Sequence, residues 1–162
     1  MLDLSDPRWS SFETTYNCNR VPLLLAEWHA AIGFDQELSR YRELGDQFMH
    51  QCTITDLAYA IVPYLVAACE SGSTKFANIY LTDVGVIEAN RLTPDYRPPK
   101  MPAFLADAYG QAIVRSQPLV EDLIDSISDP DEEWELRAIK PALFGNAELA
   151  WQQWINGFGD DQ

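Results

Sequence analysis

The stretch His50–Cys69 constrains the fold of this chain more than any other segment. From Ile54 onward its apolar residues recur at intervals of three and four, the spacing of a helix with one broad buried face. Pro63 near the middle lacks a backbone donor and predicts a bend. Such a helix needs other helices to cover its apolar face. The residues of that face are Ile54, Leu57, Ala58, Ile61, Val62, Leu65, Val66 and Cys69.

Four prolines share one local pattern, in which proline is followed by any residue, two apolar residues and a small residue. They are Pro22, Pro63, Pro102 and Pro141, spaced 41, 39 and 39 residues apart. This period is close to the roughly 40–47 residues of HEAT and armadillo repeats. We therefore predict an all-α fold, in which HEAT-like helical hairpins stack into a short right-handed α-solenoid of about four repeats.

Local signals place the other helices. Apolar spacing predicts helices over 21–32, from 36 to 49 and over 74–90, and a short helix carrying Trp9, Phe12 and Tyr16. Thr53 and Asp56 have the spacing of a capping box for the central helix. After a proline-rich connection at 92–101, helices are expected from 102 and again after 118, and strand signals are almost absent.

The clearest helix start lies at Ser128–Glu132. There Asp129 can cap the first turn, Pro130 suits the first helical position, and Glu132 favours the helix dipole. The last helical unit carries Trp134, Ile139 and Leu143, together with Trp151, Trp154 and Ile155.

Length and composition favour one domain over residues 1–162. The longest run without charged or strongly polar residues spans 13 positions, fewer than the roughly 20 of a membrane helix. The first residues lack the pattern of a signal peptide, so a cytoplasmic protein with no membrane contact is expected. Cys18, Cys52 and Cys69 show no pairing pattern, and we predict reduced, mostly packed thiols.

The chain has 25 acidic and 11 basic residues, a formal net charge of −14. Such a field repels a phosphate backbone, so nucleic acid is not an expected partner. Two explanations of the charge stay open. It either keeps the protein soluble or attracts a basic protein partner.

No motif of a catalytic, cofactor-binding or metal site is present, and we predict that the protein is not an enzyme. The two histidines, His29 and His50, are 21 residues apart. His50 precedes the central helix, where a structural role in the turn between two helices is favoured over a functional one.

The candidate binding surface is a run of eight carboxylates without any Lys or Arg. Some of these charges favour the dipole of the helix that begins after Asp129. The others predict a negative surface that steers a cationic protein. The run comprises Glu121, Asp122, Asp125, Asp129, Asp131, Glu132, Glu133 and Glu135.

The segment His50-Gln51-Cys52-Thr53, with Ala58 and Val62-Pro63-Tyr64-Leu65, resembles a family of small bacterial proteins with HEAT-like repeats. A weaker match covers 21–24, and Cys52 stands where the family usually has glycine. The resemblance implies an immunity protein that binds a cognate toxin domain and occludes its active site, without a reaction or cofactor of its own. The alternative is a helical-repeat adaptor that binds an intracellular protein or peptide.

Overall fold

The central stretch forms one helix, α3, over Leu57–Glu70, in a computed structural model that describes residues 1–157. The helix continues through Pro63, and 11 of its 14 residues are buried. Burial therefore extends around the whole helix, beyond the single face that the spacing predicts. A helix that is apolar on all sides belongs in a core, and α3 packs against both α4 and α5.

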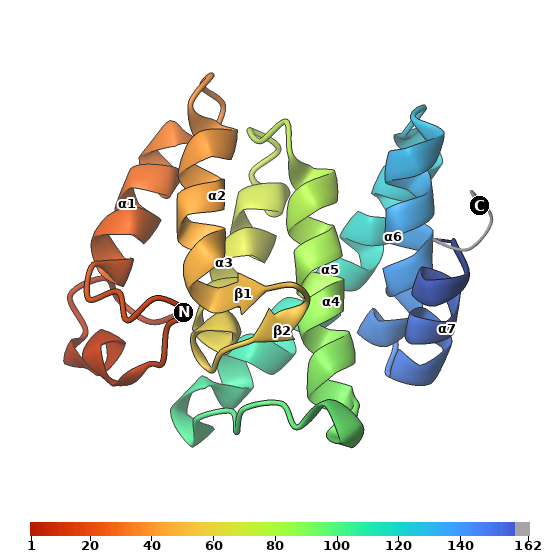
Figure 1. Cartoon of the computed structure of the whole chain (residues 1–162). Coiled ribbons are helices and arrows are strands. Elements are labelled where there is room, and N and C mark those ends of the chain that lie inside the picture. Colours follow the sequence, from red (N-terminus) through yellow and green to blue (C-terminus); the bar gives the residue numbers. More distant parts are fainter. Residues whose placement is uncertain (158–162) are drawn as a thin grey trace.

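The prediction of an all-α fold is confirmed, with the addition of one small two-stranded sheet (Figure 1). Residues 1–157 also contain three short 3₁₀ helices: η1 Pro7–Ser11 before the first α-helix, and η2 Pro94–Tyr96 and η3 Ala103–Leu105 between α4 and α5. The strands are β1 Met49–His50 and β2 Thr53–Ile54. Besides α3, the helices are α1 Val21–Ala31, α2 Glu37–Phe48, α4 Ala77–Leu92, α5 Ala106–Ser126, α6 Pro130–Leu143 and α7 Ala147–Gly157.

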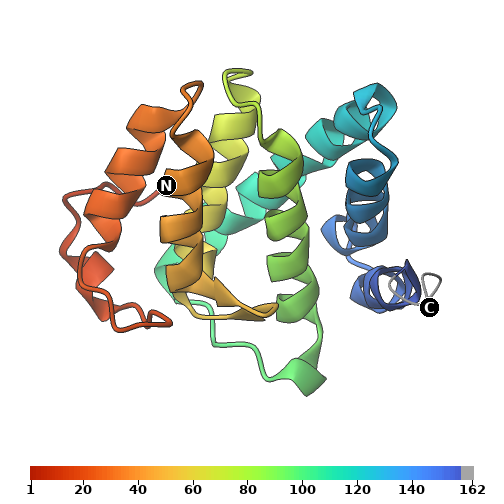
Figure 2. The ribbon, with the colours of Figure 1, turned by 45° about the horizontal axis from the view of Figure 1, so that its top comes forward.

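Helices α2, α4 and α6 lie side by side across one face of the molecule (Figures 1 and 2). Tyr41 of α2 donates a hydrogen bond to Asp83 of α4, and Gly85 of α4 lies against Ile139 of α6. Behind this layer α3 packs on α5, with the rings of Tyr59 and Tyr109 edge to face at 5.4 Å. Each of these contacts joins helices two apart along the chain, so the helices form two layers.

A buried carboxylate joins the turn after α1 to the turn before α4. Glu37 is fully buried and accepts hydrogen bonds from the Gly33 amide and the Tyr80 hydroxyl, each at 2.8 Å, and from the Thr74 hydroxyl. The indole of Trp28 donates to the same Tyr80 hydroxyl at 2.9 Å. These donors satisfy a charge that would otherwise be costly to bury.

The connection between α2 and α3 is a β-hairpin rather than the capped helix start that the sequence predicts. Strands β1 and β2 pair antiparallel, and both turn residues, Gln51 and Cys52, have positive φ angles of 48° and 61°. Thr53 lies in β2, and Asp56 accepts from the Glu13 amide at 2.7 Å instead of capping α3. The expected capping box is therefore wrong, because Asp56 binds the N-terminal segment.

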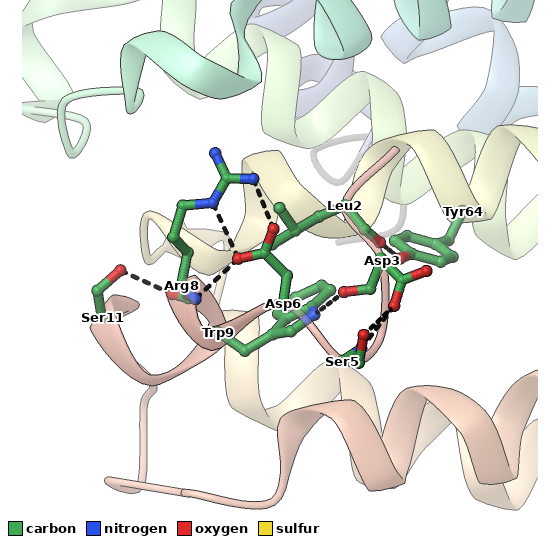
Figure 3. A network of polar contacts seen from close by, with 8 residues as sticks. All are labelled: Leu2, Asp3, Ser5, Asp6, Arg8, Trp9, Ser11 and Tyr64. Atoms are coloured by element: carbon green, nitrogen blue, oxygen red, sulfur yellow. Dashed lines mark hydrogen bonds and ion pairs between the residues drawn. The ribbon is translucent and has the colours of Figure 1, made fainter.

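The N-terminal segment forms η1 and not a helix with Trp9, Phe12 and Tyr16 on one face. Trp9 and Phe12 are buried, but Tyr16 is 60% exposed. Figure 3 shows how polar contacts fix this segment: the Trp9 indole donates to the Asp3 carbonyl at 2.7 Å, and the Tyr64 hydroxyl of α3 donates to the Leu2 carbonyl. The segment thus packs against α3 at Tyr64.

Hydrogen bonds within the same segment shape its first turn (Figure 3). The Asp6 carboxylate accepts from the backbone and the side chain of Arg8, both at 2.9 Å. These bonds lower the pKa of Asp6 to about 2. Asp6 is therefore the cap of η1, with Pro7 in the first turn.

Two expectations based on prolines are corrected. The separate helix expected after Pro118 is part of α5, which continues through that residue. The carbonyl that loses its donor there belongs to Val114, an exposed residue, so water can replace the lost bond. The four patterned prolines also occupy unlike positions: the start of α1, the middle of α3, the residue before η3 and the last turn of α6. Their period therefore does not mark equivalent points of a repeat.

Candidate functional site: an acidic tip at the junction of α5 and α6

The eight predicted carboxylates gather where α5 ends and α6 begins, and we call this cluster the acidic tip. Glu121, Asp122 and Asp125 lie in the last turns of α5. The other five follow within the cap and the first two turns of α6. This junction lies at one end of the molecule, away from α1 (Figure 2).

The tip is built on a well-capped helix start. The Asp129 carboxylate accepts from the Asp131 amide at 2.9 Å, and Pro130 occupies the first turn. Asp131, Glu132 and Glu133 follow in that turn, where negative charge favours the helix dipole. The predicted start of this helix is thus confirmed.

Two of the eight carboxylates have a cationic neighbour. Glu121 pairs with Lys140 at 2.9 Å and Glu133 with Arg137 at 2.7 Å. Both cations come from the later turns of α6, which the sequence run does not include. Among residues 1–157, no ion pair involves the other six: Asp122, Asp125, Asp129, Asp131, Glu132 and Glu135.

Five of these six carboxylates are exposed, and Glu135 is half-buried. Burial raises the pKa of Glu135, and the neighbouring charges of Glu132 and Asp131 raise it further. Burial raises the pKa of Asp83 on α4, and the charge of Glu135 adds to this shift. The charge of the tip therefore influences Asp83, a carboxylate on α4 that lies outside the tip.

Asp83 and Tyr41 are functional candidates that sequence reasoning missed. Their contact spans 42 positions, and no local pattern identifies it. A weak signal existed, because an aspartate within an otherwise apolar helix face (Tyr80, Leu81, Val84) is unusual.

The histidines and cysteines are dispersed. Both His29 and His50 are exposed, and the His50 ring meets Tyr16 edge-on at 6.3 Å in the turn between α2 and α3. The three cysteines are free; Cys52 is exposed and the other two are partly buried. Within residues 1–157, no three histidine, cysteine or carboxylate side chains converge as a metal site would require.

No protein-family model, curated protein or solved structure matches this chain. Among the helices of residues 1–157, none combines the length and hydropathy that a bilayer-spanning segment requires.

Proposed function

We propose that this protein is a cytoplasmic immunity protein that binds a cognate bacterial toxin domain and occludes its active site, with the acidic tip as the contact surface. The observation that carries this proposal is the set of six tip carboxylates without an ion pair in residues 1–157. An unneutralised surface of one sign attracts a partner of the opposite sign and accelerates its association.

The tip is suited to occlusion because it stands on packed helices. α6 packs against α4, α5 and α7, and Leu136 and Ile139 anchor it in the core with at most 2% exposure. A surface that is rigid before binding loses little conformational entropy when the partner docks. Inhibition by coverage requires no catalytic group on this chain.

The same proposal includes a HEAT-like arrangement of the helices. The pairing of α2 with α4 and α4 with α6, and of α3 with α5, supports stacked helical hairpins. The segment that resembles the immunity-type family forms the β-hairpin and α3 as far as Leu65. Cys52, which replaces the usual glycine, has a φ angle of 61°, a conformation that glycine adopts without strain.

The test is capture followed by rescue. The purified protein is used as bait in extracts of the native host, and captured proteins are identified by mass spectrometry. Each candidate is then expressed in cells with and without this protein. The proposal predicts a captured toxin domain whose growth arrest is relieved by co-expression. A captured toxin whose effect persists contradicts the immunity role, and capture of a harmless protein favours the adaptor alternative.

A further inference from the structure

A groove opens between α2 and α4. Its volume is about 270 Å³, slightly below the roughly 300–1,000 Å³ of typical small-molecule sites. Leu38, Met49 and Ile79 give it apolar walls, and Asp46 and Asp83 contribute carboxylates. The groove therefore has the size of one long side chain.

Asp83 is the polar centre of this groove. It lies one helical turn after Ile79 and accepts a hydrogen bond from the Tyr41 hydroxyl. Burial and the charge of Asp83 hold the pKa of Tyr41 well above its ordinary value, so Tyr41 stays a donor. The ion pairs among residues 1–157 involve neither Asp46 nor Asp83.

The charged and titratable groups around Asp83 are predominantly acidic. Arg42 and Asp46 line the groove from α2. The Cys52 thiol interacts electrostatically with Asp83 from the β-hairpin, and Glu135 does so from α6. The charged groups at this site are therefore one guanidinium, that of Arg42, and three carboxylates, those of Asp46, Asp83 and Glu135. This excess of negative charge favours a cationic occupant.

We propose that this groove anchors one arginine or lysine side chain of the protein partner, with its stem on Leu38 and Ile79 and its cation against Asp83. Long cationic side chains bury their methylenes on apolar surface while the charge reaches a polar group. A metal ion fits less well, because hard cations require several oxygen ligands and the walls are apolar. This inference rests on the proposed function, since it names the chemistry of the partner's contact.

The groove and the tip would then have different roles. Exposed charges at a rim mainly accelerate association, whereas a desolvated contact in a pocket contributes most of the binding energy. Glu135 interacts electrostatically with both sites, with Glu132 and Asp131 of the tip and with Asp83 of the groove.

The site also implies a pH dependence of binding. Burial raises the pKa of Asp83 to about 7, with the Tyr41 hydrogen bond opposing the shift and Glu135 adding to it. At pH 6 about nine in ten molecules then carry a protonated Asp83, which does not attract a cation. Binding of a cation is expected to be about tenfold weaker at pH 6 than at pH 8 and to release a proton near neutrality.

The test uses N-acetyl-arginine amide as the probe and N-acetyl-citrulline amide, which has the same shape without the charge, as its control. NMR titration of the isotope-labelled protein follows the methyl groups of Leu38 and Ile79 and the carboxyl carbon of Asp83. Arginine amide is expected to shift these signals at pH 8, and citrulline amide to bind about tenfold more weakly or not at all.

Two variants make the outcome decisive. Asp83→Asn and the groove-filling Leu38→Trp should each lose arginine binding by about tenfold or more, while Asp95→Asn, at an exposed carboxylate outside the groove, should bind as the wild type does. Thermal unfolding verifies that each variant is folded. Arginine binding that survives Asp83→Asn, or shifts confined to the tip, would overturn the inference.

The outcome separates this inference from the proposed function. If arginine amide occupies the groove but no toxin is captured, the anchor site stands and the immunity role fails. If a captured toxin binds Asp83→Asn with unchanged affinity, the immunity role stands and the anchor site fails.

Discussion

Gly85 of α4 lies directly against Ile139 of α6. A Cβ atom at position 85 would lie 2.8 Å from the Cβ of Ile139, closer than two carbon atoms approach without a shift of the backbone. Gly85→Ala is therefore expected to lower the free energy of unfolding by about 1–3 kcal/mol. The measurement is chemical denaturation.

The matched control is Gly110→Ala in α5, where an added Cβ meets no atom within 4 Å. Because alanine favours a helix over glycine, this change should raise the free energy of unfolding by about 0.5–1 kcal/mol. Equal effects at the two positions would contradict the close packing of α4 on α6.

The β-hairpin turn predicts a stabilising substitution. Cys52 has a φ angle of 61°, and its carbonyl accepts from the Asn90 side chain at 2.9 Å. Cys52→Gly removes the Cβ strain and keeps this bond, so the free energy of unfolding should rise by about 1 kcal/mol. Cys52→Ala removes the thiol but keeps the Cβ, and the same gain from alanine would argue against backbone strain as the cause.

Because the Glu37 carboxylate is buried and hydrogen-bonded, even a substitution of similar shape should lower the free energy of unfolding. Glu37→Gln replaces one acceptor oxygen by an NH₂ group, which then faces the amide of Gly33 or the hydroxyls of Tyr80 and Thr74. Because these donors would then be poorly paired, the free energy of unfolding should fall by about 1–3 kcal/mol. Thermal or chemical denaturation measures this change. Glu43→Gln, exposed on the same helix, should change stability by less than about 1 kcal/mol.

Asp83 predicts how stability depends on pH. Its folded-state pKa is about 7, above the ordinary value of 3.8, so the folded protein binds a proton more tightly than the unfolded chain. The protonation of Asp83 therefore stabilises the folded protein. This stabilisation is fully present below about pH 4 and is lost as the pH rises through about 7. Asp83→Asn should therefore be more stable than the wild type at pH 8, by on the order of 2–4 kcal/mol.

The check is chemical denaturation of both proteins from pH 4 to pH 8. The difference in free energy of unfolding between Asp83→Asn and the wild type should grow as the pH rises. The free energy of unfolding of Asp122→Asn should follow the same pH dependence as that of the wild type. A constant difference across this range would show that Asp83 titrates normally.

The sequence predicted the elements that local chemistry specifies. Asp129 and Pro130 mark the start of α6 because capping and a fixed φ act within one turn. The buried α3 was predictable from apolar spacing alone. The eight tip carboxylates were predictable as a cluster because they are close along the chain.

The missed features depend on contacts between distant segments. The N-terminal segment binds Asp56 and so removes the capping box, and the hairpin at Gln51 and Cys52 uses positive φ angles that neither residue type suggests. The contact of Tyr41 with Asp83 depends on the register between α2 and α4, which periodicity does not define. Lys140 and Arg137 neutralise two tip charges because a helix brings later turns back beside earlier ones.

The most direct test of the acidic tip as the binding surface is the affinity for the captured toxin as a function of ionic strength. Isothermal titration calorimetry would compare the wild type with a triple charge reversal at exposed tip positions: Asp125→Lys, Asp131→Lys and Glu132→Lys. The matched control reverses three exposed carboxylates elsewhere and has the same net charge: Glu13→Lys, Asp35→Lys and Asp95→Lys.

We predict that the tip reversal raises Kd more than tenfold at low salt and flattens its salt dependence, while the control stays close to the wild type. Equal Kd values for the two triple variants at low salt would contradict the role of the acidic tip as the binding surface. The tip charges would then contribute only to the net charge of the protein.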